Sequence, residues 1–138
     1  MLAVSIWTFW IKKVINTKFA KLVAYCQETG SQLVSFMDTN SHNGPLWGND
    51  VNDVNPRGRV LGDYIIKNNL NVLNKGDEIT YARRDVATQI DVCLASSELS
   101  SYVNHFVERG AIPSSDHISL EFIIKLDPGP PQRGMGFY

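Results

Sequence analysis

Residues 32–40 read QLVSFMDTN, an apolar run that ends in an acid and an amide. Its first six residues are mainly apolar and partly β-branched, which predicts a short strand buried on both faces. Asp38 and Asn40 follow at the strand end, where α/β folds bind their ligands. If the strand continues through them, the two side chains point the same way, and a carboxylate beside an amide suits a phosphate bound with a cation. The alternative is an Asx turn that caps the strand.

The segments on either side of this strand alternate between helical and extended patterns. Apolar residues at steps of four, three and four predict a one-sided helix over residues 12–29, which Gly30 ends. Residues 38–56 predict a long loop because they are rich in Asn, Asp, Gly and Pro, and a second amphipathic helix follows over residues 57–69. Further strands are predicted over residues 70–73, 80–83, 90–95, 103–108 and 118–124.

Length and composition limit the class of protein. The chain has 138 residues, 43% of them hydrophobic and 20% charged, which predicts one globular domain over residues 1–126 and a Pro- and Gly-rich tail over residues 127–138. The net charge of −1 excludes a protein that holds nucleic acid by bulk positive charge. Residues 1–11 are apolar but too short to span a bilayer, and their lysines follow rather than precede them. We expect a strand or the start of a helix there, and no membrane partner.

The two cysteines, Cys26 and Cys93, lack the spacing of metal ligands. Free cysteines are commonly buried, so both are predicted to be core thiols of a reducing compartment. We therefore expect an intracellular protein.

Two acidic positions next to apolar strands need an explanation. Asp91 lies inside the apolar run IDVCLA, where a carboxylate is costly unless it finds a partner. Asp116 and His117 lie where a loop enters another apolar segment. A histidine that a carboxylate orients becomes a general base, which takes a proton from water. A lone histidine is more often structural or solvated, so the argument depends on these residues occurring together.

Basic and aromatic residues outside these positions are candidates for binding nucleic acid. Trp47 can stack on a base or wedge a groove, or it can simply cover the core. Guanidinium groups bind phosphate oxygens in a fork, although arginines at helix starts and turns are as often only solvated. The candidate phosphate contacts are Arg57, Arg59, Arg83 and Arg84.

Five motifs follow one another in order along residues 32–124. They are a hydrophobic strand leading into Asp38-Thr-Asn40, then Leu46-Trp47-Gly48, Arg57-Gly58-Arg59, Ile90-Asp91 and Ser115-Asp116-His117. Together they resemble the endonuclease/exonuclease/phosphatase superfamily, most closely the endonuclease domain of jockey-type non-LTR retrotransposon polyproteins, which also carry a reverse transcriptase. The resemblance implies an α/β fold of the DNase-I type, a two-sheet β-sandwich flanked by helices.

The resemblance also implies roles for individual residues. His117 is expected to activate the attacking water, and Asp91 to orient it. Asp38 and Asn40 are expected to position the nucleophile and the phosphate. Asp116, together with Asn40, is expected to lie beside a divalent metal, Mg²⁺ or Mn²⁺. The implied function is metal-dependent phosphodiester hydrolysis, the nicking of DNA by a retrotransposon-type endonuclease, in the nucleus if the DNA is chromosomal.

Members of this family are longer than this chain at the amino end, where the resemblance implies the first strands and a metal-binding glutamate. Glu28 is the only acid before Asp38 and lies at a predicted helix end, so it does not match that glutamate. We therefore expect a domain truncated at its amino end, with weak metal binding and an open sheet edge. Two alternatives follow: an inactive fragment that acts as a binding or assembly module and self-associates through that edge, and a phosphatase of the same superfamily.

Overall fold

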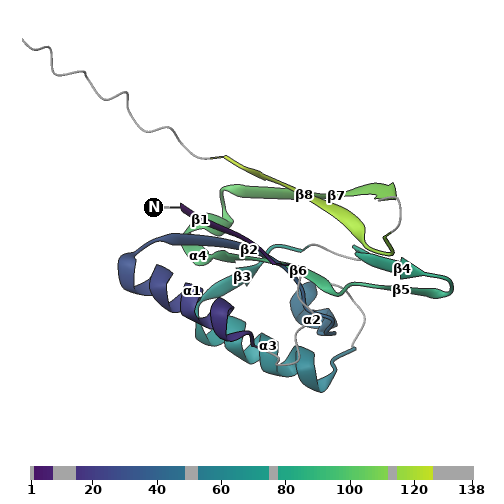
Figure 1. The fold of residues 1–138 in the computed structure, drawn as a ribbon, viewed down its shortest axis with the longest axis horizontal. Helices are drawn as coiled ribbons and strands as arrows, with labels where there is room; N and C mark the ends of the chain where they lie inside the picture. The colour runs from purple at the N-terminus through teal and green to yellow at the C-terminus, as the bar shows by residue number, and fades with distance from the viewer. Residues whose placement is uncertain (1, 8–14, 49–52, 75–77, 112–114, 126–138) are drawn as a thin grey trace, which may run out of the picture.

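The computed structural model describes residues 2–7, 15–48, 53–74, 78–111 and 115–125. The predicted tail over residues 127–138 lies outside the described residues. Helices and strands alternate along the chain, as the sequence patterns predict (Figure 1). The elements are, in order, β1 (Leu2–Trp7), α1 (Thr17–Thr29), β2 (Gln32–Asp38), α2 (Gly44–Trp47), α3 (Pro56–Lys67), β3 (Leu70–Val72), β4 (Tyr81–Arg83), β5 (Val86–Thr88), β6 (Asp91–Ser96), α4 (Ser97–Ser100), β7 (Val103–Ala111) and β8 (Ile118–Ile124).

The central sheet has four strands in the order β1-β2-β6-β3. β1 runs parallel to β2, whereas β6 is antiparallel to both of its neighbours, β2 and β3. Along β2, Leu33 and Met37 pack into the core on one face of the sheet, and Val34 packs into the core on the other. Because both faces are covered, the prediction of a strand buried on both sides is confirmed.

Helices α1 and α3 cover one face of this sheet (Figure 1). Asn16 is the N-cap of α1, and its side chain accepts the Lys18 N–H at 2.8 Å, so the helix begins later than the apolar pattern predicts. Gly30 ends it with a φ of 65°, as predicted. None of the described helices is long and apolar enough to cross a membrane. The buried residues between helices and sheet include Phe19, Val23, Cys26, Leu61, Ile65, Val92 and Leu94.

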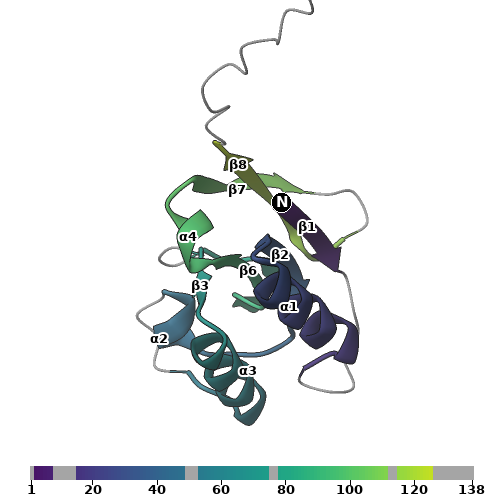
Figure 2. The ribbon, with the colours of Figure 1, turned by 90° about the vertical axis from the view of Figure 1, so that its left-hand side faces the viewer.

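The β7–β8 hairpin covers the opposite face of the central sheet (Figure 2). Its two antiparallel strands form a separate sheet. The structure is therefore a sheet-on-sheet sandwich with helices outside, which confirms the predicted fold class. The second core contains Val34, Leu73, Cys93, Ala95, Leu99 and Val103, with Phe36 and Ile124 packed against it.

Three short elements depart from the predicted pattern. Helix α2 interrupts the segment expected to be a long loop, where Asn43 caps it and Gly48 ends it. Strand β5 pairs with β4 in a hairpin that turns at Arg84 and Asp85. Helix α4 follows β6 directly. Each spans three or four residues, too few for hydrophobic periodicity to reveal.

Candidate active site

Two carboxylates face each other at one end of the central sheet. Asp38, the last residue of β2, is the register partner of Asp91, the first residue of β6. Side chains alternate along a strand, so Asp38 shares its face with Phe36, and Asp91 shares its face with Cys93. Phe36 and Cys93 belong to the core beneath β7–β8. Both carboxylates therefore point to the side of the sheet on which β8 lies.

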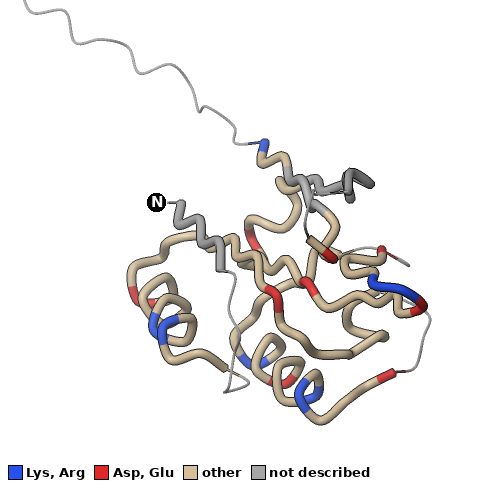
Figure 3. The backbone as a smooth tube through the Cα atoms, turned by 45° about the vertical axis from the view of Figure 1, so that its right-hand side comes forward, with Lys and Arg blue, Asp and Glu red and all other residues tan. Residues whose placement is uncertain are grey.

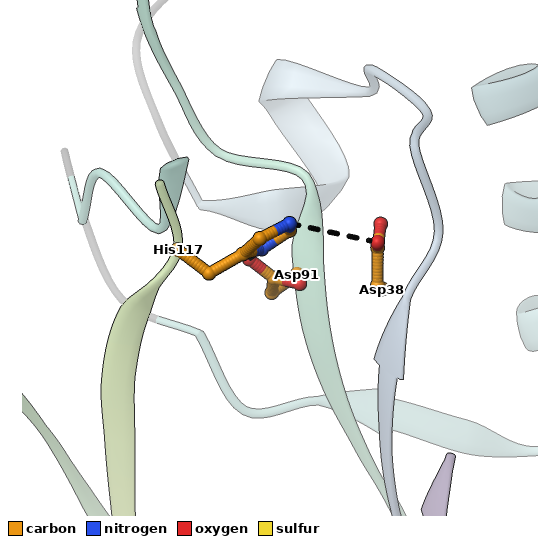
Figure 4. A group of neighbouring side chains, drawn as sticks. All are labelled: Asp38, Asp91 and His117. Atoms are coloured by element: carbon orange, nitrogen blue, oxygen red, sulfur yellow. Dashed lines mark hydrogen bonds and ion pairs between the residues drawn. The ribbon is translucent and has the colours of Figure 1, made fainter. Parts of the chain in front are cut away.

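His117 is the partner that the largely buried carboxylate of Asp91 requires (Figure 4). It lies just before β8, with its Nδ1 2.9 Å from Asp91 Oδ2 and its Nε2 3.7 Å from Asp38 Oδ2. The side chains of Asp91, Asp38 and His117 are 14%, 25% and 35% exposed, so the histidine is the most accessible of the three to water. A carboxylate on Nδ1 leaves Nε2 free to accept a proton, which is the geometry of a general base.

Burial and the neighbouring charges shift the pKa of both members of this pair. Burial raises the pKa of Asp91, hydrogen bonds with His117 and Thr80 oppose that shift, and the charge of Asp38 adds to it. Burial lowers the pKa of His117, but the hydrogen bond to Asp91 and the charges of three nearby carboxylates outweigh burial, so this pKa lies above its ordinary value. Perturbed titrating groups of this kind gather at functional sites.

Thr80 connects the start of β6 to the start of β8, and no pattern in the sequence predicts this role. It is fully buried, and its Oγ1 accepts the N–H groups of Ile90 and Asp91 at 3.0 and 2.9 Å. Its carbonyl accepts the Ile118 N–H at 2.8 Å. Thr80 therefore holds Asp91 and the residue after His117 at the same time. A single threonine ahead of a short strand carries no spacing signal, so only the fold reveals this role.

Tyr81 packs against the histidine from the β4–β5 hairpin. Its ring meets the His117 imidazole edge-on, with centroids 5.2 Å apart and an interplanar angle of 72°. The backbones of the two residues also form an isolated antiparallel bridge. These contacts restrict the orientation of the imidazole, in addition to its bond with Asp91.

Asn40 lies outside the strand that carries Asp38. β2 ends at Asp38 and Asn40 has a φ of 44°, so strand alternation does not extend to Asn40. The condition for a shared side-chain direction is therefore not met. The Asn40 N–H donates to Asp38 Oδ1 at 3.1 Å, which is the Asx turn that the sequence left as an alternative. Asp38 still presents its other oxygen to His117.

Asp116 and two of the predicted arginines, Arg83 and Arg84, lie at the exposed rim of the site. Asp116 Oδ2 is 3.5 Å from Arg83 Nε. Arg83 ends β4 and Arg84 forms the turn that follows, and this basic stretch appears in blue at the right of Figure 3. Arg59 is exposed on α3. The rim therefore combines one carboxylate with exposed positive charges.

Two of the predicted nucleic-acid contacts are turned toward the protein. Trp47 is fully buried, and its Nε1–H donates to the Ser41 carbonyl at 3.2 Å. Of the two alternatives for Trp47, stacking on a base or wedging a groove is therefore wrong, and covering the core is right. Arg57 donates from Nε to the Thr39 carbonyl at 3.0 Å.

One group of side chains in the described part of the chain can hold a metal ion. Its donor atoms, from Asp38, Asp91 and His117, lie within 4.8 Å of one another. Carboxylate oxygens suit a divalent cation, and a cation here also relieves the repulsion between two opposed acids. Asn40 and Asp116, the predicted ligands, do not belong to this group, but each is close to it in sequence and offers another oxygen donor.

A comparison with protein families identifies the family of this chain. A family model described as endonuclease-reverse transcriptase matches residues 6–121, a span that contains Asp38, Asp91 and His117. The chain belongs to the endonuclease-reverse transcriptase family. The resemblance found in the sequence is thereby confirmed, and the chain is an endonuclease-type domain.

Solved structures support the same fold for this family member. The endonuclease domain of TRAS1, a telomere-specific non-LTR retrotransposon, matches with a TM-score of 0.69 and 23% sequence identity. The match covers 87% of this chain and 56% of the TRAS1 chain, so this chain spans little more than half of that domain's length. Comparison with curated proteins gives no match.

Proposed function

We propose that this endonuclease-type domain nicks DNA by hydrolysing a phosphodiester bond with the help of a divalent metal. The observation that carries the proposal is the oriented histidine, His117, held by Asp91 and facing Asp38 at the end of the sheet. A histidine held in this way is suited to remove a proton from water. Membership of the endonuclease-reverse transcriptase family supports a phosphodiester as the substrate.

Each residue of the group has a role in this proposal. His117 Nε2 accepts the proton of the attacking water. Asp91 accepts the Nδ1–H of His117, fixes the tautomer and stabilises the imidazolium that forms. Asp38, 3.7 Å from Nε2, orients the water, and the Asn40 side chain donates to a phosphoryl oxygen.

The proposed cofactor is Mg²⁺ or Mn²⁺. When bound, such a cation neutralises the charge that develops on the phosphate and on the leaving oxygen. The residues proposed to hold it are Asp38, Asp116 and Asn40, all of which offer oxygen donors, while Asp91 stays with His117. Two carboxylates give a hard cation modest charge compensation, so we expect weak affinity.

Arg59, Arg83 and Arg84 are the proposed contacts to DNA phosphates. All three are exposed, and the hairpin pair lies close to Asp116 at the rim of the site. Because the chain has a net charge of −1, a few local arginines must supply the attraction, and binding should be sensitive to salt. A chromosomal substrate would place the protein in the nucleus.

Supercoiled plasmid incubated with the purified chain and Mn²⁺ or Mg²⁺ tests the proposal. We expect conversion to nicked circles that EDTA abolishes and that is lost in His117→Ala and Asp91→Asn. Glu98→Gln is the matched control, because it removes an exposed carboxylate from α4, outside the catalytic group. Nicking that survives in His117→Ala, or no nicking at any metal concentration, would overturn the proposal.

Two alternatives predict different results in the same preparations. A binding or assembly module that self-associates through a sheet edge is supported by the β7–β8 sheet, which has two strands among the described residues. It predicts metal-independent dimers in light scattering and no nicking. A phosphatase predicts release of phosphate from phosphomonoesters with plasmid left intact.

A further inference from the structure

The segment that follows Asp38 lies against the start of helix α3. The Asn55 N–H donates to the His42 carbonyl at 3.0 Å, and Asn43 Nδ2 donates to the Gly58 carbonyl at 3.1 Å. A third contact joins His42 Nδ1 to Asp53 Oδ2 at 2.6 Å. We call these contacts the clasp. They hold the loop after β2 to the start of helix α3.

Two glycines on α3 allow this close approach. A side chain at Gly58 would overlap the His42 carbonyl, so the clasp requires glycine there. At Gly62 an added Cβ would lie 2.7 Å from Asn43 Nδ2. Helix α3 can therefore lie directly against the loop.

Arg57 makes the contact nearest the catalytic group. Its Nε donates to the carbonyl of Thr39 at 3.0 Å, and Thr39 stands between Asp38 and Asn40. Thr39 is buried, and its N–H and Oγ1 both donate to the Ile90 carbonyl, at 2.9 and 2.7 Å. One residue thus links the first turn of α3 to the strand that begins at Asp91.

We propose that Arg57 is a positioning residue, which fixes Asp38 and Asn40 by holding the Thr39 carbonyl from α3. Without this donor, the peptide between Thr39 and Asn40 can rotate, and the turn at Asn40, with its φ of 44°, loses a constraint. The proposal deepens the proposed nuclease function, on which its kinetic consequence rests. Its structural consequence can be measured without any cleavage.

The rival role for Arg57 is a contact to a DNA phosphate, and Arg57→Gln separates the two. In glutamine, Nε2 occupies the position along the side chain that Nε has in arginine, so the variant keeps a donor for the carbonyl and removes the charge. A positioning role is therefore retained in Arg57→Gln and lost in Arg57→Ala, whereas a phosphate contact is lost in both. Arg59→Ala is the matched control, because it removes an exposed arginine two positions along the same helix.

Amide hydrogen exchange, followed by NMR on the full chain without metal or DNA, tests the structural part. In Arg57→Ala we expect the protection of the Thr39 amide to fall about tenfold or more relative to that of Cys93, which reports on the centre of the sheet. Arg57→Gln and Arg59→Ala should keep the wild-type ratio. Equal ratios in wild type and Arg57→Ala would overturn the proposal, as would an Arg57→Gln ratio as low as that of Arg57→Ala.

Binding of an oligonucleotide duplex at several salt concentrations tests the rival role. We expect Arg57→Gln to leave the slope of log affinity against log salt unchanged, whereas losing a phosphate contact reduces it by about one unit. A reduced slope in Arg57→Gln, with normal Thr39 protection in Arg57→Ala, would assign Arg57 to the phosphate instead. If the chain binds no duplex at all, the proposed function fails, and the exchange experiment still tests whether Arg57 positions the Thr39 carbonyl. If the chain nicks, Arg57→Ala should lower kcat and leave KM for DNA unchanged.

Discussion

Asp38 and Asp91 lie directly opposite each other on two antiparallel strands, with the imidazole of His117 next to both carboxylates. Like charges that oppose each other across a sheet destabilise the fold. A protein selected only for stability would not keep this pair. The arrangement therefore has the stability cost that is expected of a functional site.

The first prediction concerns Asp38→Asn. The amide keeps an acceptor for the Asn40 N–H and removes the charge that opposes Asp91. At pH 8.5 we expect the free energy of unfolding to rise by about 0.5 kcal/mol, while nicking falls by about 100-fold or more. Urea denaturation and the plasmid assay measure the two effects. Asp63→Asn on the exposed side of α3 is the control, and a loss of stability in Asp38→Asn alone would count against repulsion between the acids.

The second prediction concerns pH. A general base must be neutral, and the pKa of His117 is raised above 6.5. The nicking rate should therefore increase with pH, and the midpoint of this increase should lie above pH 6.5. Single-turnover rates measured across pH at fixed metal concentration locate this midpoint. In Asp91→Asn the midpoint for the residual rate should lie at lower pH. A midpoint below pH 6.5 in the wild type would contradict the ion-pair geometry.

The same pKa shift predicts a change in stability with its own sign. Protonated His117 is held by carboxylates in the folded chain, so its contribution to stability is complete below the unfolded pKa near 6.5 and is lost as pH rises through the higher folded pKa. The difference in unfolding free energy between wild type and His117→Asn should therefore shrink as the pH rises above 6.5. A difference that grows over that window would show that the histidine is held as a neutral group.

The third prediction concerns Thr80→Val. The variant keeps the shape of the side chain but leaves the N–H groups of Ile90 and Asp91 without their acceptor in a buried place. We expect a loss of about 1–3 kcal/mol in the free energy of unfolding and a large loss of nicking. Thr80→Ser keeps the hydroxyl and should lose less of both. Equal losses in the two variants would mean that the methyl group, not the hydroxyl, matters at this position.

The fourth prediction concerns Gly58→Ala. An added methyl group overlaps the carbonyl of His42, so helix and loop must move apart. We expect a loss of about 1–3 kcal/mol in the free energy of unfolding, measured by urea denaturation. Val60→Ala, on the exposed side of the same helix, should change stability by less than about 0.5 kcal/mol. Tolerance of alanine at position 58 would mean that the clasp is not a close contact.

The sequence predicts those parts of the fold and site that leave a repeated or costly pattern. The buried strand at 32–37 and the helices around it follow from periodicity, and Asp91 stands out because a charge in an apolar run demands a partner. Thr80, Arg57 and the burial of Trp47 leave no such pattern. Their roles depend on which backbone groups lie nearby in space, and residues 80, 57 and 47 meet their partners only after the chain has folded.

Side chains of β2 alternate between the two faces of the sheet. This alternation places apolar side chains in both cores, and it also sets the face on which Asp38 lies. In β2, Leu33 and Met37 take one face while Val34 and Asp38 take the other. A slip of one residue in this strand would exchange the faces and separate Asp38 from Asp91. A chain in the slipped register would carry all the residues proposed for catalysis without the group that they form, so the proposed activity depends on the burial of ordinary aliphatic residues.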